Sequence, residues 1–331
     1  MVRDFFEARG FVVREEPFGF QPMAVEALPI LGAGIGWLAL LELPFLLLPS
    51  LSGGYGGALW VAGLTALGAV VWAVATGARI PGAAVRQDAN LLATLGDSPV
   101  RRWIVAHVDT KAQGHSMAGR LVAVWLLILA VAGITALLAW RMAAGPPPGG
   151  AVAAAAGLVG AAGLLASRGR LSGRSPGARD NATGLLAALV AADACVPGIG
   201  FLFTGAEEFS LAGARAYVGS GVDLGGSEWV NLDTLTDRGR LYLVSHDRSG
   251  ADLADRIAPL LRALDIPLRK RRLPAGVLVD SVALSRAGAQ ACTISRLDWQ
   301  DFRLIHTSRD TLDGLDPATA IRVGGALTRV G

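Results

Sequence analysis

The chain has 331 residues, of which 52% are hydrophobic and 17% are charged, and its mean hydropathy is +0.47. Soluble domains carry about 25% charged residues, so this composition excludes a disordered chain and argues against a single soluble domain. With 30 basic and 27 acidic residues, the charge is too balanced for a nucleic-acid-binding protein, which would show a basic stripe. Two cysteines, Cys195 and Cys292, cannot form a disulfide framework, and we expect both to be small buried residues.

The first 27 residues, 1–27, precede the apolar part of the chain. They carry acidic residues and lack the apolar core of a cleavable signal peptide. We expect them to form a cytoplasmic N-terminal segment with a short amphipathic piece at the surface.

Four apolar runs then reach the length of about 20 residues that a membrane-spanning helix needs. They are residues 28–49, 57–78, 121–140 and 150–167. The fourth run consists of small residues that suit close helix packing in a bilayer, and the turn GPPPGG joins it to the third. The pattern predicts two transmembrane hairpins, over 28–78 and 119–168.

The distribution of basic residues predicts the orientation of these hairpins. The loop 50–56 has no Lys or Arg, and the loop 141–149 has only Arg141. The opposite side carries thirteen: Arg3, Arg9, Arg14, Arg79, Arg86, Arg101, Arg102, Lys111, Arg120, Arg168, Arg170, Arg174 and Arg179. We therefore expect a multi-pass protein of the cell membrane whose termini, 79–120 segment and residues after 168 are cytoplasmic.

Glu42 is an ionisable residue inside the first apolar run. Such a residue is a functional candidate by default. We favour the alternative, in which Glu42 lies near the end of the span and is protonated or snorkels toward the interface.

The remaining chain alternates between short apolar runs and helical patterns. WIVAHVDT (103–110), FLFTG (201–205) and WVNLDTL (229–235) have the pattern of buried strands, and 184–196 and 211–221 have helical periodicity. This alternation predicts an α/β fold with a sheet flanked by helices. We expect the RKRR cluster at 269–272 to be a solvated loop.

Histidines and carboxylates stand at the ends of the predicted strands or at turns. They are His107, Asp109, Asp180, Glu207, Glu208, Asp233 and His306. Ligands of open α/β sheets bind beyond the carboxyl ends of the strands. Imidazole together with carboxylate suits zinc, and a shared carboxylate suits two metals side by side. Each motif alone also fits a helix cap or a surface salt bridge.

Taken together, five blocks in one order resemble the M28 family of zinc aminopeptidases. The blocks are AHVDT, GARDNATG, GAEEFSLAG, NLD and HTSRDTLD, and the resemblance covers about 89–117 and 171–325. It implies a mixed β-sheet flanked by helices, to which about four transmembrane helices are added. Leu284 stands where the family has an aromatic residue, and Gln290 stands where the family has proline. The resemblance therefore does not predict the shape of the substrate pocket.

The resemblance also implies roles for individual residues. His107, Asp180 and Asp233 would hold one Zn²⁺, and Asp180 would bridge to a second Zn²⁺ held also by Glu208 and His306. Glu207 would be the general base, taking a proton from the metal-bridging water and passing it to the leaving amine. Asp109 would orient His107 through its second ring nitrogen.

One feature departs from soluble members of the family, which join the HxD strand to the bridging aspartate by a short loop. Here the hairpin 119–168 separates the first part of the peptidase domain, 79–118, from its main part, 169–331. An even number of crossings keeps His107 and Asp180 on one side of the membrane. The active site would then lie close to the bilayer surface.

Other motifs have simpler explanations. GRSPG (173–177) matches a nucleophile elbow, but Pro176 lacks the backbone N–H that an oxyanion hole needs there, which excludes a serine hydrolase. His115 and His246 lie outside the blocks and are expected to be ordinary polar residues.

Three functions remain in consideration. The preferred hypothesis is a membrane-anchored dizinc aminopeptidase with peptide substrates. The alternatives are a carboxypeptidase or amidohydrolase on the same scaffold, and an inactive membrane scaffold or sensor. The sequence predicts neither the preferred substrate nor the oligomeric state.

Overall fold

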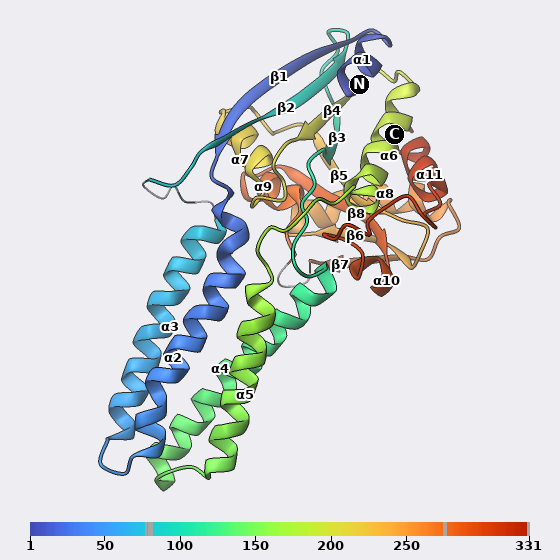
Figure 1. Ribbon diagram of the computed structural model, residues 1–331. Coiled ribbons are helices and arrows are strands. Elements are labelled where there is room, and N and C mark those ends of the chain that lie inside the picture. The colour runs from blue at the N-terminus through green and yellow to red at the C-terminus, as the bar shows by residue number, and fades with distance from the viewer. Residues whose placement is uncertain (77, 79–81, 274–276, 330–331) are drawn as a thin grey trace. The chain divides into compact units, whose positions relative to one another are not determined.

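The computed structural model describes residues 1–76, 78, 82–273 and 277–329 (Figure 1). The chain forms two compact units, each assembled from separate stretches of sequence. The sheet unit consists of Met1–Pro22, Ala84–Ala112 and Gly173–Gly331, and the helical unit of Met23–Ala83 and Gln113–Ser172.

An eight-stranded mixed sheet organises the sheet unit, with the order β1-β2-β4-β3-β5-β8-β6-β7. Its strands are β1 (Phe11–Phe20), β2 (Arg86–Leu95), β3 (Arg102–His107), β4 (Ile199–Thr204), β5 (Glu228–Leu235), β6 (Arg240–Ser245), β7 (Leu268–Arg272) and β8 (Gln290–Leu297). The strands β4, β3, β5 and β8 run parallel in the centre, whereas β2 and β6 join them antiparallel. This confirms the predicted mixed sheet and the three predicted strands.

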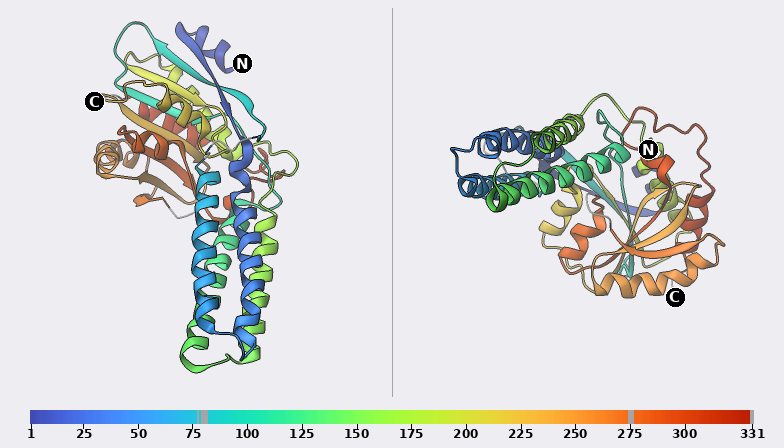
Figure 2. Two further views of the ribbon diagram at one scale, coloured as in Figure 1. Left: turned by 90° about the vertical axis from the view of Figure 1, so that its left-hand side faces the viewer. Right: turned by 90° about the horizontal axis from the view of Figure 1, so that it is seen from below.

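Helices cover both faces of the sheet, as the two views in Figure 2 show. The helices and short turns of this unit are α1 (Val2–Glu7), the π-turn η2 (Ala178–Ala182), α6 (Thr183–Asp193), α7 (Ala212–Gly219), α8 (Arg248–Arg262), α9 (Asp280–Arg286), α10 (Trp299–Phe302) and α11 (Ala318–Leu327). On β3, Ile104 and Ala106 pack in the core formed with α6, α8 and α11, whereas Val105 packs in the opposite core with α7 and α9. Because both faces are buried, residues 103–106 of β3 and 199–203 of β4 form runs without a polar side chain.

The helix α1 is the short amphipathic piece expected in the first residues: it packs Phe6 into the main core and leaves Asp4 and Glu7 exposed. The strand β1, which pairs with β2 along ten residues, was not predicted. The expectation for the RKRR cluster was wrong: it is not a loop but the end of β7, which among the described residues pairs with β6 alone and exposes its basic side chains. Charged side chains suit such an edge strand, because they oppose pairing with another sheet.

The helical unit contains four helices that are long and apolar enough to cross a membrane. They are α2 (Ala27–Leu47), which follows the short 3₁₀ turn η1 (Pro22–Glu26), α3 (Gly53–Ala75), α4 (Met117–Ala144) and α5 (Gly149–Ser167). Small residues allow α2 to approach α5: a Cβ at Gly32 would lie 2.5 Å from the Cβ of Ala166. Gly77, near the end of the second predicted span, lies outside the described residues.

Glu42 is buried inside this unit, and neither of its carboxylate oxygens has a hydrogen-bond partner among the described residues. The carboxyl group therefore does not snorkel toward the interface. Arg141 instead occupies the end of α2, where its guanidinium donates to the carbonyl oxygens of Phe45 at 2.9 Å and Leu51 at 2.8 Å. It satisfies acceptors that a helix C-terminus leaves without partners.

Candidate active site

Three neighbouring parallel strands bring most of the predicted site residues to one edge of the sheet. His107 is the last residue of β3, Glu207 and Glu208 follow the end of β4, and Asp233 lies near the end of β5. Asp180 lies in η2, just before α6, and joins them from a different segment. The carboxyl ends of parallel strands meet at a common edge, which is where α/β sheets bind ligands.

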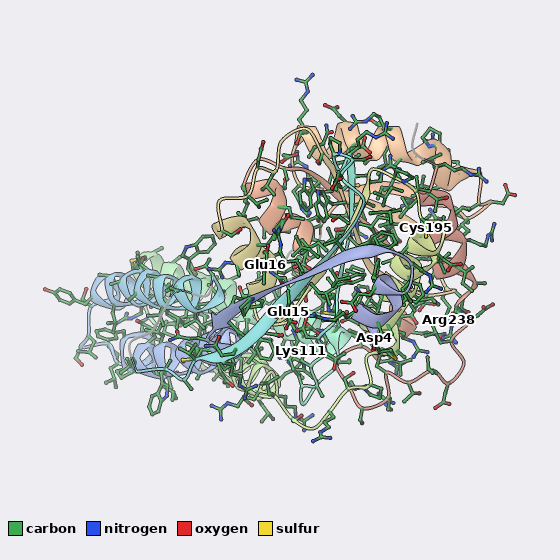
Figure 3. The ribbon with its side chains drawn as sticks, turned by 90° about the horizontal axis from the view of Figure 1, so that it is seen from above. Asp4, Glu15, Glu16, Lys111, Cys195 and Arg238 are labelled. Carbon is green, nitrogen blue, oxygen red and sulfur yellow. The ribbon has the colours of Figure 1, made fainter. Side chains whose placement is uncertain are left out.

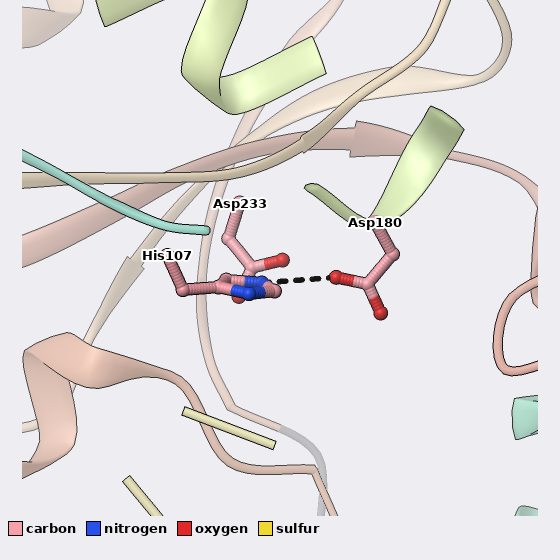
Figure 4. Close-up of side chains that lie close together, drawn as sticks. All are labelled: His107, Asp180 and Asp233. Atoms are coloured by element: carbon pink, nitrogen blue, oxygen red, sulfur yellow. Dashed lines mark hydrogen bonds and ion pairs between the residues drawn. The ribbon is translucent and has the colours of Figure 1, made fainter. Parts of the chain in front are cut away.

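His107, Asp180 and Asp233 form a first group of potential metal ligands (Figure 4). One ligand atom of each lies within 4.8 Å of the others. The Nε2 atom of His107 is 3.0 Å from Oδ1 of Asp180. The structure thus brings together residues that are up to 126 positions apart in the chain.

A second group consists of Asp180, Glu208 and His306, and one ligand atom of each again lies within 4.8 Å of the others. Nε2 of His306 lies 3.3 Å from Oδ2 of Asp180 and 3.1 Å from Oε1 of Glu208. Asp180 belongs to both groups, and it directs one carboxylate oxygen to each histidine. This is the arrangement that a bridging carboxylate requires.

The chemistry of these side chains fits two divalent ions such as Zn²⁺. Each group offers imidazole nitrogen and carboxylate oxygen, which are the ligands that zinc takes in catalytic sites. Oε1 of Glu208 and Nδ1 of His306 are buried yet make no hydrogen bond to a described residue. A buried acceptor without a partner is costly, and a metal ion next to Glu208 would satisfy it.

Charges within the site shift the pKa of several of these groups. Burial lowers the pKa of His107, but the carboxylates of Glu207, Asp109 and Asp180 outweigh it and raise the pKa well above its usual value. Burial raises the pKa of Glu208, but His306 and Lys111 outweigh it and lower the pKa to about 2. The histidines and Lys111 thus balance the negative charge of the carboxylates.

Glu207 belongs to neither group, although its carboxylate interacts electrostatically with members of both, His107 and Glu208. Burial raises its pKa well above the usual range, and Glu208, Asp280 and Asp233 raise it further, against the opposing effect of His107. A carboxylate that readily holds a proton suits the general base predicted from the sequence.

Asp109 connects the first ligand to the two glutamates. Its carboxylate accepts hydrogen bonds from the backbone N–H of Glu207 at 2.9 Å and of Glu208 at 3.2 Å. Nδ1 of His107 lies 3.1 Å from the backbone carbonyl oxygen of Asp109 and 3.6 Å from its carboxylate. Asp109 therefore contacts the second ring nitrogen mainly through its main chain, and its carboxylate holds the turn that carries Glu207.

Sequence reasoning missed two buried groups that support the site. Asp280, at the start of α9, accepts a hydrogen bond from Thr204, and burial raises its pKa to about 6. Arg179 pairs with Asp301 at 3.1 Å and Asp310 at 3.4 Å. Arg179 adjoins the candidate ligand Asp180 in the sequence, but its partners Asp301 and Asp310 follow more than 120 residues later.

His246 and the two cysteines lie outside both groups. Nε2 of His246 is 2.8 Å from Oγ of Ser281, as expected of an ordinary polar residue. Cys292 is buried as predicted, whereas Cys195 is half-buried. His115 lies in the helical unit and is buried.

The model of peptidase family M28 matches residues 161–330, which is more than half of the chain. The chain belongs to peptidase family M28. The matched segment contains four of the five predicted ligands and Glu207, while His107 and Asp109 precede it and enter the site through β3. No curated protein matches this M28 chain.

Solved structures share the fold at low sequence identity. The glutaminyl cyclase of Porphyromonas gingivalis is 15% identical over 90% of this chain and 96% of its own, with a TM-score of 0.50. The LapA aminopeptidase of Legionella pneumophila is 17% identical over 92% of this chain and 71% of its own, with a TM-score of 0.48. A zinc aminopeptidase from Bacillus subtilis is 18% identical over 74% of this chain, with a TM-score of 0.45, and this M28 chain spans 50% of its length.

Without metal, the sheet unit is expected to lose stability as the pH rises from about 4 to 7. Burial raises the pKa of Asp233 to about 7 and that of Asp280 to about 6. In this range the folded state holds protons that the unfolded state has released, so each rise in pH favours unfolding. The lowered pKa of Glu208 acts at more acidic pH, outside this window.

Thermal unfolding of the chelated protein at four pH values tests this expectation, with Tm falling by several degrees across the window. With added Zn²⁺, Tm should instead rise with pH, because metal binding requires deprotonated ligands. A Tm that is flat or rising with pH in the chelator would contradict the expected coupling.

Proposed function

We propose that this protein is a membrane-anchored, zinc-dependent aminopeptidase that removes N-terminal residues from peptides. The observation that carries the proposal is the position of Asp180 in both ligand groups, with Glu207 beside them and in neither. A shared carboxylate suits a pair of metal ions, and a separate carboxylate leaves a group for proton transfer.

His107, Asp180 and Asp233 would hold one Zn²⁺, and Asp180, Glu208 and His306 the other. When bound, the ions would supply polarisation of the scissile carbonyl and a lower pKa of the attacking water. Glu207 would accept the proton of that water and deliver it to the leaving amine. Asp109 would keep Glu207 in place through the backbone hydrogen bond that its carboxylate accepts.

Two other activities fit the same scaffold. A carboxypeptidase or amidohydrolase would use the same ligands with a different substrate, and a glutaminyl cyclase shares the fold. An inactive scaffold is a weaker candidate, because it has no use for a buried general base beside two complete ligand groups.

A panel of peptides distinguishes these activities in the metal-loaded protein. We expect release of the first residue from peptides with a free N-terminus and at least about a hundredfold slower cleavage of the same peptides when N-acetylated, because the free amine is the group that an aminopeptidase must recognise. A peptide with N-terminal glutamine reports cyclisation as loss of ammonia without hydrolysis. Equal cleavage of blocked and free peptides would refute the aminopeptidase proposal.

We further propose that the four apolar helices cross the cell membrane with both termini in the cytoplasm. The length and composition of the helices support the crossing, and the excess of Lys and Arg in the predicted cytoplasmic segments supports the orientation. A reporter that works only in the cytoplasm should then be active when it is fused to the C-terminus. Activity of a reporter specific for the opposite side would overturn the orientation.

A further inference from the structure

Lys111 is a buried lysine that lies beside the second ligand group. It follows the HxD motif by two residues and is labelled in Figure 3. Its side chain is 5% exposed. Its ammonium lies 2.6 Å from Oε2 of Glu208 and donates a hydrogen bond to the Glu208 backbone carbonyl oxygen at 3.2 Å.

The two carboxylate oxygens of Glu208 have different surroundings. Oε2 faces the ammonium of Lys111, whereas Oε1 lies 3.1 Å from Nε2 of His306 and makes no hydrogen bond. Lys111 therefore leaves Oε1 as the oxygen that is available to a metal ion. The same lysine places a positive charge next to that position.

The first ligand group has no such cation. In the described part of the chain, the ion pairs of His107 and Asp180 are with one another, Asp109 and His306, and Asp233 has none. The two positions share Asp180, and among the described residues the ammonium of Lys111 pairs with the second of them, at Glu208. Charges this close interact strongly in a buried site, where the effective dielectric constant is far below that of water.

We propose that Lys111 lowers the affinity of the metal position formed by Asp180, Glu208 and His306, so that the two ions bind in sequence. The position formed by His107, Asp180 and Asp233 fills first. In the metal-free protein, Lys111 compensates the charge of Glu208 in place of the second ion. This inference rests on the proposed function, because it requires two metal positions, and it assigns Lys111 a positioning role outside the ligand set.

Two effects of Lys111 on the second position oppose one another. Its positive charge repels a divalent ion, but its hydrogen bond orients Glu208 for that ion. We infer that repulsion is the larger effect, because removing the ammonium leaves a buried carboxylate without compensation, and such a charge is strongly destabilised until a cation binds. Loss of the lysine should therefore strengthen metal binding.

Lys111→Met tests this inference, because methionine keeps an unbranched apolar stem and removes the charge. The full-length protein in detergent is freed of metal and dialysed against buffers of fixed free Zn²⁺, and bound zinc per chain is measured by mass spectrometry. In the wild-type protein, bound zinc per chain should rise in two separate steps as the free Zn²⁺ concentration increases. In the variant, the second step should move to at least about tenfold lower free Zn²⁺ while the first step moves much less.

Three further variants make the test specific. Lys270→Met removes the same charge from an exposed site and should leave both steps unchanged. Lys111→Arg keeps the charge and should keep the steps apart. Lys111→Gln can still donate to Glu208 and should shift the second step in the same direction as methionine, which also provides for the case in which Lys111→Met fails to fold.

The second position can also be observed alone. His107→Ala removes a ligand from the first position only, and the remaining site should bind Zn²⁺ more tightly when Lys111→Met is added. A second step that is weakened or unchanged by loss of the lysine would overturn the inference. Absence of zinc from wild type at every free concentration would instead refute the proposed function.

Discussion

Replacing Glu207 by glutamine is expected to lower kcat by about a thousandfold or more, with bound zinc unchanged. Glutamine keeps the shape of the side chain but cannot take a proton from water and return it to an amine. Glu207 belongs to neither ligand group, so its replacement removes no metal ligand. The measurement pairs aminoacyl-arylamide hydrolysis with metal analysis of the same preparation.

Glu208→Gln is the matched comparison at the next position. It alters a member of the second ligand group, so it should lower both activity and zinc content. Glu16→Gln changes a glutamate of β1 outside both groups and should leave both unchanged. If Glu207→Gln retained more than about a tenth of the wild-type kcat, Glu207 would not be the general base.

Replacing Arg179 by methionine should destabilise the sheet unit by about 3–5 kcal/mol, because a broken buried ion pair leaves charges without compensation. The Arg179 side chain is 3% exposed and lies against the buried carboxylates of Asp301 and Asp310. Its guanidinium also donates to the carbonyl oxygen of Thr311 at 2.8 Å. Methionine offers none of these contacts, and we expect Tm to fall by about 10 °C.

The same substitution should weaken zinc binding, because Asp310 also holds the bridging ligand. Its two carboxylate oxygens accept hydrogen bonds from the backbone N–H groups of Arg179 at 2.9 Å and Asp180 at 3.3 Å. Arg238→Met is the control: in the described part of the chain, the side chain of this half-buried arginine donates a hydrogen bond to Gln300 alone, and its loss should change the stability by less than about 0.5 kcal/mol. Similar Tm values for the two variants would show that the Arg179 network does not stabilise the fold.

The outcome for particular residues shows where sequence reasoning succeeds. His107, Glu207, Glu208 and Asp233 stand at or near the carboxyl ends of their strands, and the carboxyl ends of parallel strands meet at one edge, so their proximity was predictable. The four apolar helices were predictable for a similar reason, because hydropathy depends on composition within a short window.

The residues that were missed depend on partners distant in the chain. Arg179 and Asp301 are 122 positions apart, and Lys111 and Glu208 are 97 apart, so no local pattern reveals these pairs. The N-terminal strand was missed because its pairing with β2 depends on an edge that forms only when the sheet is assembled. The burial of Glu42 likewise follows from packing against other helices.

By itself, the sequence determined the class of the fold and the number of apolar helices, because each depends on residue type and local spacing, and its resemblance to family M28 supplied the candidate ligands. Only the tertiary structure decided that the carboxylate of Asp109 holds the glutamate turn, that Asp310 holds the backbone of Asp180, and that Lys111 faces Glu208. These contacts join segments from different strands and loops. Their physical origin is the burial of charges that can be tolerated only when the folded chain provides a partner for each.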